Sequence, residues 1–227
     1  MNGIKKRKVG FFSFPTPYSL LPIPYILIIA GMTSCLGVNA DITLNADNSG
    51  TISLEYRISQ AFDSLGRLDG NEARPPLPVG RMDFERTVER IPGMRLLSYV
   101  SRDSGSDRIV TARLEFSTID DLLQFLDASG QRADYVPGQK KISFILNPGN
   151  NASTSEFNAL ISQISQGYNI AISMSFPSEG TVNVLDAEGR ASIARATVQP
   201  RGRKVSASLP LETVLSDEKG ITLEFRW

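Results

Sequence analysis

The 227-residue chain has no histidine and only one cysteine, Cys35. Without histidine there can be no Ser-His or Cys-His pair of the kind that activates hydrolytic nucleophiles, and the commonest transition-metal ligand is missing. A single cysteine can form neither an internal disulfide nor a zinc site built from a cysteine cluster. We therefore expect a protein that is not an enzyme and that holds no metal and no cofactor.

Charge is balanced over the whole chain, with 24 basic and 24 acidic residues. Four of the basic residues form the run Lys5-Lys6-Arg7-Lys8, and the first 34 residues contain no acid. The remainder has 20 basic and 24 acidic residues, a net charge of −4. Nucleic-acid binders carry a basic surplus, so we expect no nucleic-acid partner. The chain also has no phosphate-binding loop and no dinucleotide fingerprint.

The first 34 residues have the pattern of an export signal. The basic run precedes an apolar stretch from Val9 to Ala30, and small residues follow. Met32-Thr33-Ser34-Cys35 resembles the lipobox of bacterial lipoproteins, with Met32 where leucine is usual. We therefore predict a lipoprotein signal peptide at 1–34, a lipidated tether at 35–40 and one globular domain at 41–227. Acylated Cys35 would make membrane lipid a partner and place the domain on the exported side of the bacterial cell envelope.

Two alternatives remain open. Val38-Asn39-Ala40 before Asp41 suits ordinary signal peptidase, which would release a soluble exported protein. The apolar run could also stay as an uncleaved span, since about 20 residues suffice to cross a bilayer.

Alternating apolar and polar residues predict strands through most of the domain. The first hairpin comprises 42–44 and 52–58 around an Asn/Asp/Gly turn at 45–50, and the second comprises 96–100 and 109–116. The turn at 45–50 also resembles a calcium loop, but Tyr56 occupies the position that requires glutamate. Further strands are expected at 135–136, 140–146, 170–176 (ended by Pro177), 181–185, 191–198, 204–209 and 221–227.

Helical spacing and capping residues predict fewer helices. We expect helices at 59–66, at 83–91, after the Thr118–Asp121 capping box, and after a second box at Ser153–Glu156, with a helical turn at 210–215. A Gly- and Pro-rich loop is expected at 67–80. Because helices fall between hairpins, the predicted fold class is α+β, a mostly antiparallel β-sheet with helices packed on one face.

Cys35-Leu36-Gly37-Val38, which runs into the hairpin at 41–58, resembles the LppM-like domain of bacterial lipoproteins. In that family a lipidated cysteine precedes such a hairpin, and β-rich segments with one or two helices follow. The family often ends in a transmembrane segment, whereas the last fifty residues here have a β pattern. The resemblance implies an envelope-facing, non-enzymatic domain that handles lipid or other apolar ligands.

The densest basic stretch is a candidate for contact with anionic lipid headgroups, although a solvated strand face explains it as well. It comprises Arg190, Arg195, Arg201, Arg203 and Lys204. Asp120 and Asp121 could form a carboxylate pair, but their position at a predicted helix start explains them without chemistry.

The sequence thus predicts an envelope lipoprotein that acts as a binding or structural module, with an apolar groove between sheet and helices as its site. The alternatives are a protein-interaction subunit or surface antigen that uses the 67–80 loop or an open sheet edge, and a histidine-free hydrolase.

Overall fold

The computed structural model describes residues 36–59, 78, 80–127, 130–148, 165, 167–192 and 195–227. The predicted signal peptide and Cys35 lie outside these ranges. So do almost all of the helix expected at 59–66, most of the loop at 67–80, and the helix expected after Ser153–Glu156. The chain divides into two compact units, Met1–Met32 and Thr33–Trp227, and the second contains every described residue.

The first predicted hairpin is confirmed. Strand β1 (Leu36–Leu44) pairs antiparallel with β2 (Gly50–Ser59), from Leu36 opposite Ile58 to Leu44 opposite Gly50. In the turn between them, the Asp47 carboxylate accepts hydrogen bonds from the backbone N–H of Ser49 at 3.0 Å and its hydroxyl at 2.6 Å. β1 begins earlier than the alternation predicted, so residues 36–40, which we had assigned to a tether, lie within a paired strand.

The second predicted hairpin is also confirmed and extends further than expected. β3 (Met94–Ser104) pairs with β4 (Asp107–Phe116) as far as Ser104 opposite Asp107, which leaves Gly105 and Ser106 as the turn. Gly105 has φ +63°, a value that suits glycine. β4 also pairs with β2, so one layer of the sheet has the order β3-β4-β2-β1.

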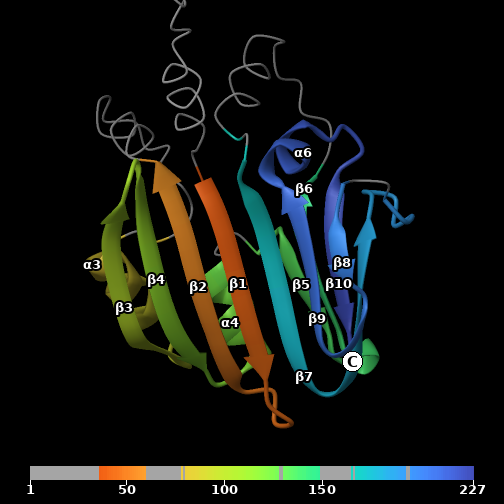
Figure 1. Cartoon of the computed structure of the whole chain (residues 1–227). Helices are drawn as coiled ribbons and strands as arrows, with labels where there is room; N and C mark the ends of the chain where they lie inside the picture. Colours follow the sequence, from red (N-terminus) through yellow and green to blue (C-terminus); the bar gives the residue numbers. More distant parts are fainter. Residues whose placement is uncertain are drawn as a thin grey trace, which may run out of the picture. The chain divides into compact units, whose positions relative to one another are not determined.

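A single long strand, β7 (Asn169–Leu185), joins this layer to a second one. Its first part pairs parallel with β1 and its last part pairs antiparallel with β10 (Ile221–Arg226). The prediction that Pro177 ends this strand is wrong: the proline lies where the register shifts between Ser175 and Gly180. A strand tolerates proline at such an irregularity, because no ladder hydrogen bond is lost there. Figure 1 shows β7 bending at this point.

The second layer continues from β10 to β6 (Lys141–Asn147) and β5 (Ala133–Val136), which are joined by a short 3-10 helix, η1 (Pro137–Gln139). β9 (Arg201–Pro210) pairs with β7, and β8 (Thr197–Gln199) pairs with β9. The strand expected at 191–198 is thus reduced to β8 and one isolated bridge from Ala191 to Leu185. All ten described strands belong to one curled sheet.

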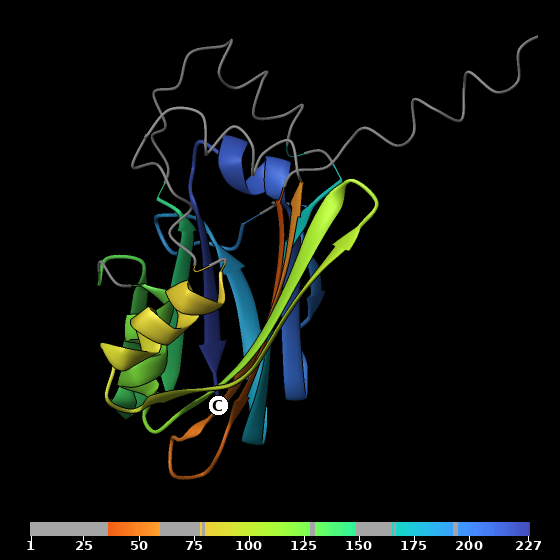
Figure 2. The same ribbon diagram turned by 90° about the vertical axis from the view of Figure 1, so that its left-hand side faces the viewer.

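The predicted α+β fold class is wrong. The described helices are short: α3 (Arg81–Glu89), α4 (Ile119–Leu126) and α6 (Leu211–Ser216). α3 packs beside β3, the strand at one end of the sheet. α4 packs beside β5, at the other end, and also contacts β4. The helices therefore lie where the two ends of the curled sheet approach each other and do not form a layer over one face (Figure 2). Local periodicity identified the strands, but it could not show that the bend in β7 makes the sheet face itself.

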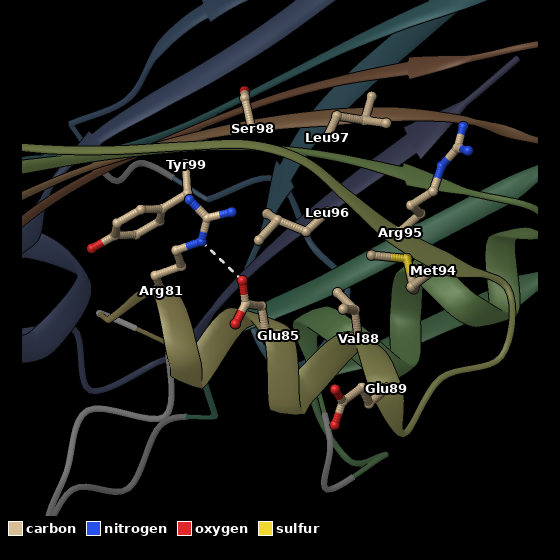
Figure 3. A pocket seen from close by; sticks show the side chains of 10 residues that line it. All are labelled: Arg81, Glu85, Val88, Glu89, Met94, Arg95, Leu96, Leu97, Ser98 and Tyr99. Atoms are coloured by element: carbon tan, nitrogen blue, oxygen red, sulfur yellow. Dashed lines mark hydrogen bonds and ion pairs between the residues drawn. The ribbon is translucent and has the colours of Figure 1, made fainter.

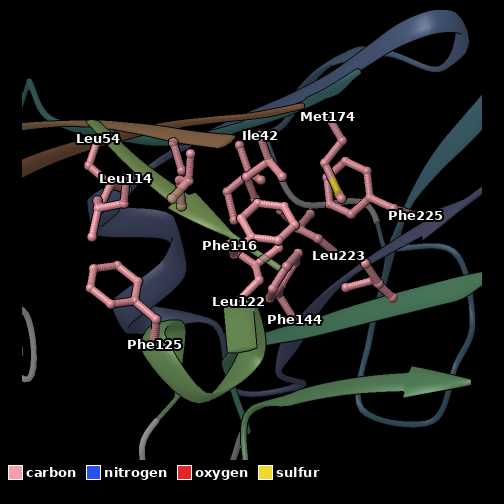
Figure 4. Close-up of a cluster of buried hydrophobic side chains, with 14 of the residues drawn as sticks. Ile42, Leu54, Leu114, Phe116, Leu122, Phe125, Phe144, Met174, Leu223 and Phe225 are labelled. Atoms are coloured by element: carbon pink, nitrogen blue, oxygen red, sulfur yellow. The ribbon is translucent and has the colours of Figure 1, made fainter. Parts of the chain in front are cut away.

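The core fills the space inside the curled sheet. Alternate residues of the strands point inward, as the period of two requires, and Leu122 and Phe125 of α4 join them. Figure 4 shows these side chains meeting between the two layers. The fully buried members include Ile42, Ile52, Leu114, Phe116, Ile142, Met174, Leu223 and Phe225.

Candidate functional site

The end of the sheet next to Cys35 is the first candidate site. β1 is an inner strand, flanked by β2 and β7. Leu36, the residue that follows Cys35, already pairs with Ile58, and Val38 pairs with Ile170 on the other side. The lipidation candidate therefore connects directly to the middle of the sheet.

Tyr168 fixes this end, which we call the anchor end. A Cβ placed on Gly37 would lie 3.1 Å from Cδ1 of Tyr168, so any larger residue would require the ring to shift by a few tenths of an ångström. The Tyr168 hydroxyl lies 3.4 Å from a carboxylate oxygen of Asp107, and its carbonyl accepts a hydrogen bond from the N–H of Leu211 at 2.8 Å. One buried aromatic residue thus contacts β1, β4 and the start of α6.

Asn147 ties the other side of α6 to the second layer. Its side-chain amide donates to the carbonyls of Val214 and Asp217, both at 2.8 Å, and the side chain is buried. α6 therefore lies at the anchor end. Hydrogen bonds to Tyr168, just before β7, and to Asn147, at the end of β6, hold the helix in position.

The five basic residues proposed for headgroup contact do not form one patch. Arg190 donates to the buried Asp186 carboxylate at 3.0 Å and also pairs with Glu188. Lys204 pairs with Asp41 at 2.5 Å. Arg195, Arg201 and Arg203 are exposed, and no ion pair to them occurs among the described residues.

Arg201 and Arg203 also lie at the wrong end of the sheet for contact with a bilayer that holds Cys35. β9 runs from Arg201 to Pro210, and Pro210 pairs with Asn169 beside the anchor end. Ten residues of strand span about 30 Å. The headgroup hypothesis is therefore not supported for these two arginines. The sequence could not show this, because which end of β9 lies near Cys35 depends on its pairing with β7, a strand that is not its neighbour in the hairpin pattern.

The acidic groups are explained by local structure. Thr118 and Asp121 form the predicted capping box: the Thr118 hydroxyl accepts from the N–H of Asp121 at 3.1 Å, and the Asp121 carboxylate accepts from the N–H of Thr118 at 3.0 Å. Asp120 lies in the same first turn, where negative charge meets the helix dipole.

Asp186 organises the turn after β7. Its carboxylate accepts from the backbone N–H groups of Arg190 at 2.9 Å and Glu188 at 3.0 Å. The hydrogen bond from the Arg190 backbone, with the guanidinium and the Glu188 N–H, lowers the pKa of Asp186. Burial raises the pKa of Tyr56, whose hydroxyl has no hydrogen-bond partner in the part of the chain that the structure describes.

Within the described ranges no group of residues could hold a metal ion, and no helix is long and apolar enough to cross a bilayer. Where the structure describes the space between sheet and helices, core side chains fill most of it, including Phe84, Phe116, Leu122 and Phe125; a hollow remains between α3 and β3.

A second candidate site is the surface formed by α3 and the terminal strand β3. Between them is a hollow of about 330 Å³ with an apolar floor and a rim that carries the Arg81–Glu85 ion pair (Figure 3). Three of the four exposed large apolar residues of the described chain lie on these two elements. They are Met82 on α3 and Leu97 and Val100 on β3. Leu97 points away from α3 in Figure 3, and Val100 pairs with exposed Thr111, so both lie on the outer face of β3 and we call these two the β3-edge patch; Val88, Leu96 and Tyr99 line the hollow on the other face.

A β-bulge explains why the sequence did not reveal this patch. The register of β3 against β4 shifts between Leu96 and Ser98, so Leu97 leaves the alternation and is 43% exposed. In the sequence, Leu96, Leu97, Tyr99 and Val100 looked like an ordinary buried strand.

No family model matches the chain, and no curated protein matches it in sequence. A search of solved structures finds the NMR structure of the folded domain of LppM from Mycobacterium tuberculosis. The match has 15% identity and a TM-score of 0.41, and it covers 86% of this chain and 91% of that chain. The N-terminal hairpin resembles the same family, but a likeness at this level carries no conclusion about fold or function.

Proposed function

We propose that this chain is a bacterial envelope lipoprotein, anchored through acylated Cys35, whose domain serves as a non-enzymatic binding or structural module. Three sequence features support the proposal: the basic and apolar leader, the lipobox-like Met32–Cys35, and the absence of histidine. The structure adds one observation that weighs against cleavage before Asp41.

That observation is the position of residues 36–40 inside β1. Cleavage before Asp41, the soluble alternative, would remove Leu36 to Ala40, which pair with β2, and Val38 to Ala40 also pair with β7. Ala40 is buried in the core. Cleavage before Cys35 leaves the whole strand in place, so the fold favours the lipoprotein site over the later one.

Metabolic labelling with an alkynyl fatty acid tests the proposal. We expect the wild-type protein to incorporate the label and Cys35→Ser to incorporate none, because the chain has no other thiol. Met32→Leu, which restores the usual lipobox residue, is the matched control and should label at least as well. Equal labelling of wild type and Cys35→Ser, or no label in either, would rule out the anchor.

A protein-interaction module is the second candidate function, and the β3-edge patch favours it. A terminal strand with exposed apolar side chains can accept a partner segment or pack against an apolar surface. An apolar ligand, if this domain binds one, has the hollow between α3 and β3, on the opposite face of that strand. A photo-crosslinking residue at Val100 in the intact envelope should capture a defined partner, while one at exposed Ala187, in the turn after β7, should not.

A further inference from the structure

We propose that the anchor end of the domain lies against the lipid headgroups and that the opposite end, with Arg201 and Arg203, points away into the aqueous compartment. This orientation rests on the proposed function, since it requires acyl chains on Cys35. It identifies the membrane-facing surface of the domain, which the presence of an anchor alone does not.

No spacer separates Cys35 from the first strand of the fold. Consecutive Cα atoms are about 3.8 Å apart, and Leu36 is already paired with Ile58. Gly37 is held beneath the Tyr168 ring. A flexible spacer would let the domain rotate freely, whereas here the acylated residue is one peptide bond away from a strand in the middle of the sheet.

The β3–β4 turn and helix α6 also lie at the anchor end. Asp107, at the start of β4, pairs with Ser59 at the end of β2, so the turn at Gly105–Ser106 lies at the anchor end. α6 lies there too, because Leu211 is bonded to Tyr168. In Figure 1 the start of β1, the start of β7 and α6 all lie at the upper side of the sheet.

Charge at the anchor end is mixed. Among the described residues, the exposed cations there are Arg57, Arg102 and Lys219, with Arg190 in the turn whose Ala187 N–H donates to the Lys219 carbonyl and Arg195 just before β8; the exposed anions are Asp103, Glu188, Glu212 and Glu218. Asp103 and Arg108 neutralise each other as an ion pair at 3.1 Å. Arg190 is likewise paired with Asp186 and Glu188, so the described part of this end presents no uniformly basic surface, and the acyl chains rather than electrostatic attraction are the main hold on the bilayer. Leu215 of α6, 37% exposed, adds one apolar contact.

The single native cysteine makes a direct test feasible. Once Cys35 is acylated, an introduced cysteine is the only free thiol for a fluorophore. Ser106→Cys and Glu218→Cys place the label at the anchor end, and Arg201→Cys places it at the opposite end; all three residues are exposed. The purified lipoproteins are reconstituted in phosphatidylcholine vesicles that contain lipid with a nitroxide on its headgroup.

We expect the nitroxide lipid to quench Ser106→Cys and Glu218→Cys several-fold more than Arg201→Cys. Mass spectrometry of each labelled protein first establishes whether acyl chains are present. Acylated protein with equal or reversed quenching would overturn the orientation and leave the anchor intact. Protein without acyl chains would overturn both proposals.

Discussion

The ring of Tyr168 lies over Gly37, so close that a Cβ on this glycine would be 3.1 Å from Cδ1 of the tyrosine. Gly37 is the second residue after Cys35, and Tyr168 immediately precedes β7. The contact therefore fixes the residues next to the proposed lipid anchor relative to both β1 and β7, and it ties the site of attachment to the stability of the fold.

Gly37→Val should destabilise the domain by about 1–3 kcal/mol, since the branched side chain would overlap the Tyr168 ring. Chemical denaturation measures the effect. Gly138→Ala is the control, because nothing lies within 4 Å of the position a Cβ would occupy there. In a Tyr168→Ala background the cost of Gly37→Val should fall, and an unchanged cost would contradict the contact.

Thr118→Ala should lower the free energy of unfolding by about 1 kcal/mol, because the hydroxyl accepts the N–H of Asp121 at the start of α4. Ser117→Ala, at the exposed neighbouring position, should change it by less than about 0.5 kcal/mol. Equal effects of the two substitutions in thermal denaturation would refute the capping role.

Trp227→Ala should cost about 2–4 kcal/mol, since the indole stacks on Phe176 at 5.0 Å and on Tyr135 at 6.0 Å between ring centroids. Trp227→Phe should cost less, because it keeps one ring between the two aromatics. Trp227 is the only tryptophan, so its fluorescence reports unfolding of this corner in the wild type. A fluorescence transition well below the melting temperature seen by circular dichroism would show that the corner unfolds separately.

The Asp186 turn should make stability depend on pH in the acid range. The Arg190 backbone hydrogen bond lowers the pKa of the folded-state carboxyl below its ordinary value of 3.8, so the unfolded state takes up a proton first as pH falls. The stabilisation is present above that ordinary value and is lost as pH falls through the folded-state pKa. Asp186→Asn should therefore be less stable than wild type at neutral pH, with the difference shrinking below about pH 4. Exposed Glu218→Gln serves as the control; a difference that grows in acid would reverse the sign and contradict this account.

Membrane retention should not depend on the basic residues at the end opposite the anchor. Along β9, Arg201 lies about 30 Å and Arg203 about 23 Å from Pro210 at the anchor end. The double change Arg201→Glu and Arg203→Glu should leave the membrane fraction unchanged, and high salt should not release the protein, since acyl chains do not depend on charge. Release by either treatment would restore the headgroup hypothesis.

Sequence patterns predicted local pairing well and distant pairing poorly. The hairpins β1–β2 and β3–β4 follow from alternation and from turn residues such as Asp47 and Gly105, because both partners are neighbours in the chain. The parallel pairing of β1 with β7 joins residues more than a hundred positions apart, and nothing in either strand specifies the other. Pro177 looked like the end of a strand because the residues after it pair with β10, which is also distant in the sequence.

The candidate site divides in the same way. The lipobox-like residues before Cys35 are a linear motif, so sequence alone could identify them. The contact of Gly37 with Tyr168, and the position of Arg201 far from the anchor, depend on the fold. Exposure of Leu97 and Val100 on the β3-edge patch could not be foreseen either, because a bulge leaves no signature in the order of residues.

The mass of the mature N-terminus tests the central claim most directly. We predict an N-terminal peptide that begins at Cys35 and carries acyl chains, with Leu36 to Ala40 retained. A peptide that begins at Asp41, or an intact leader, would contradict the account.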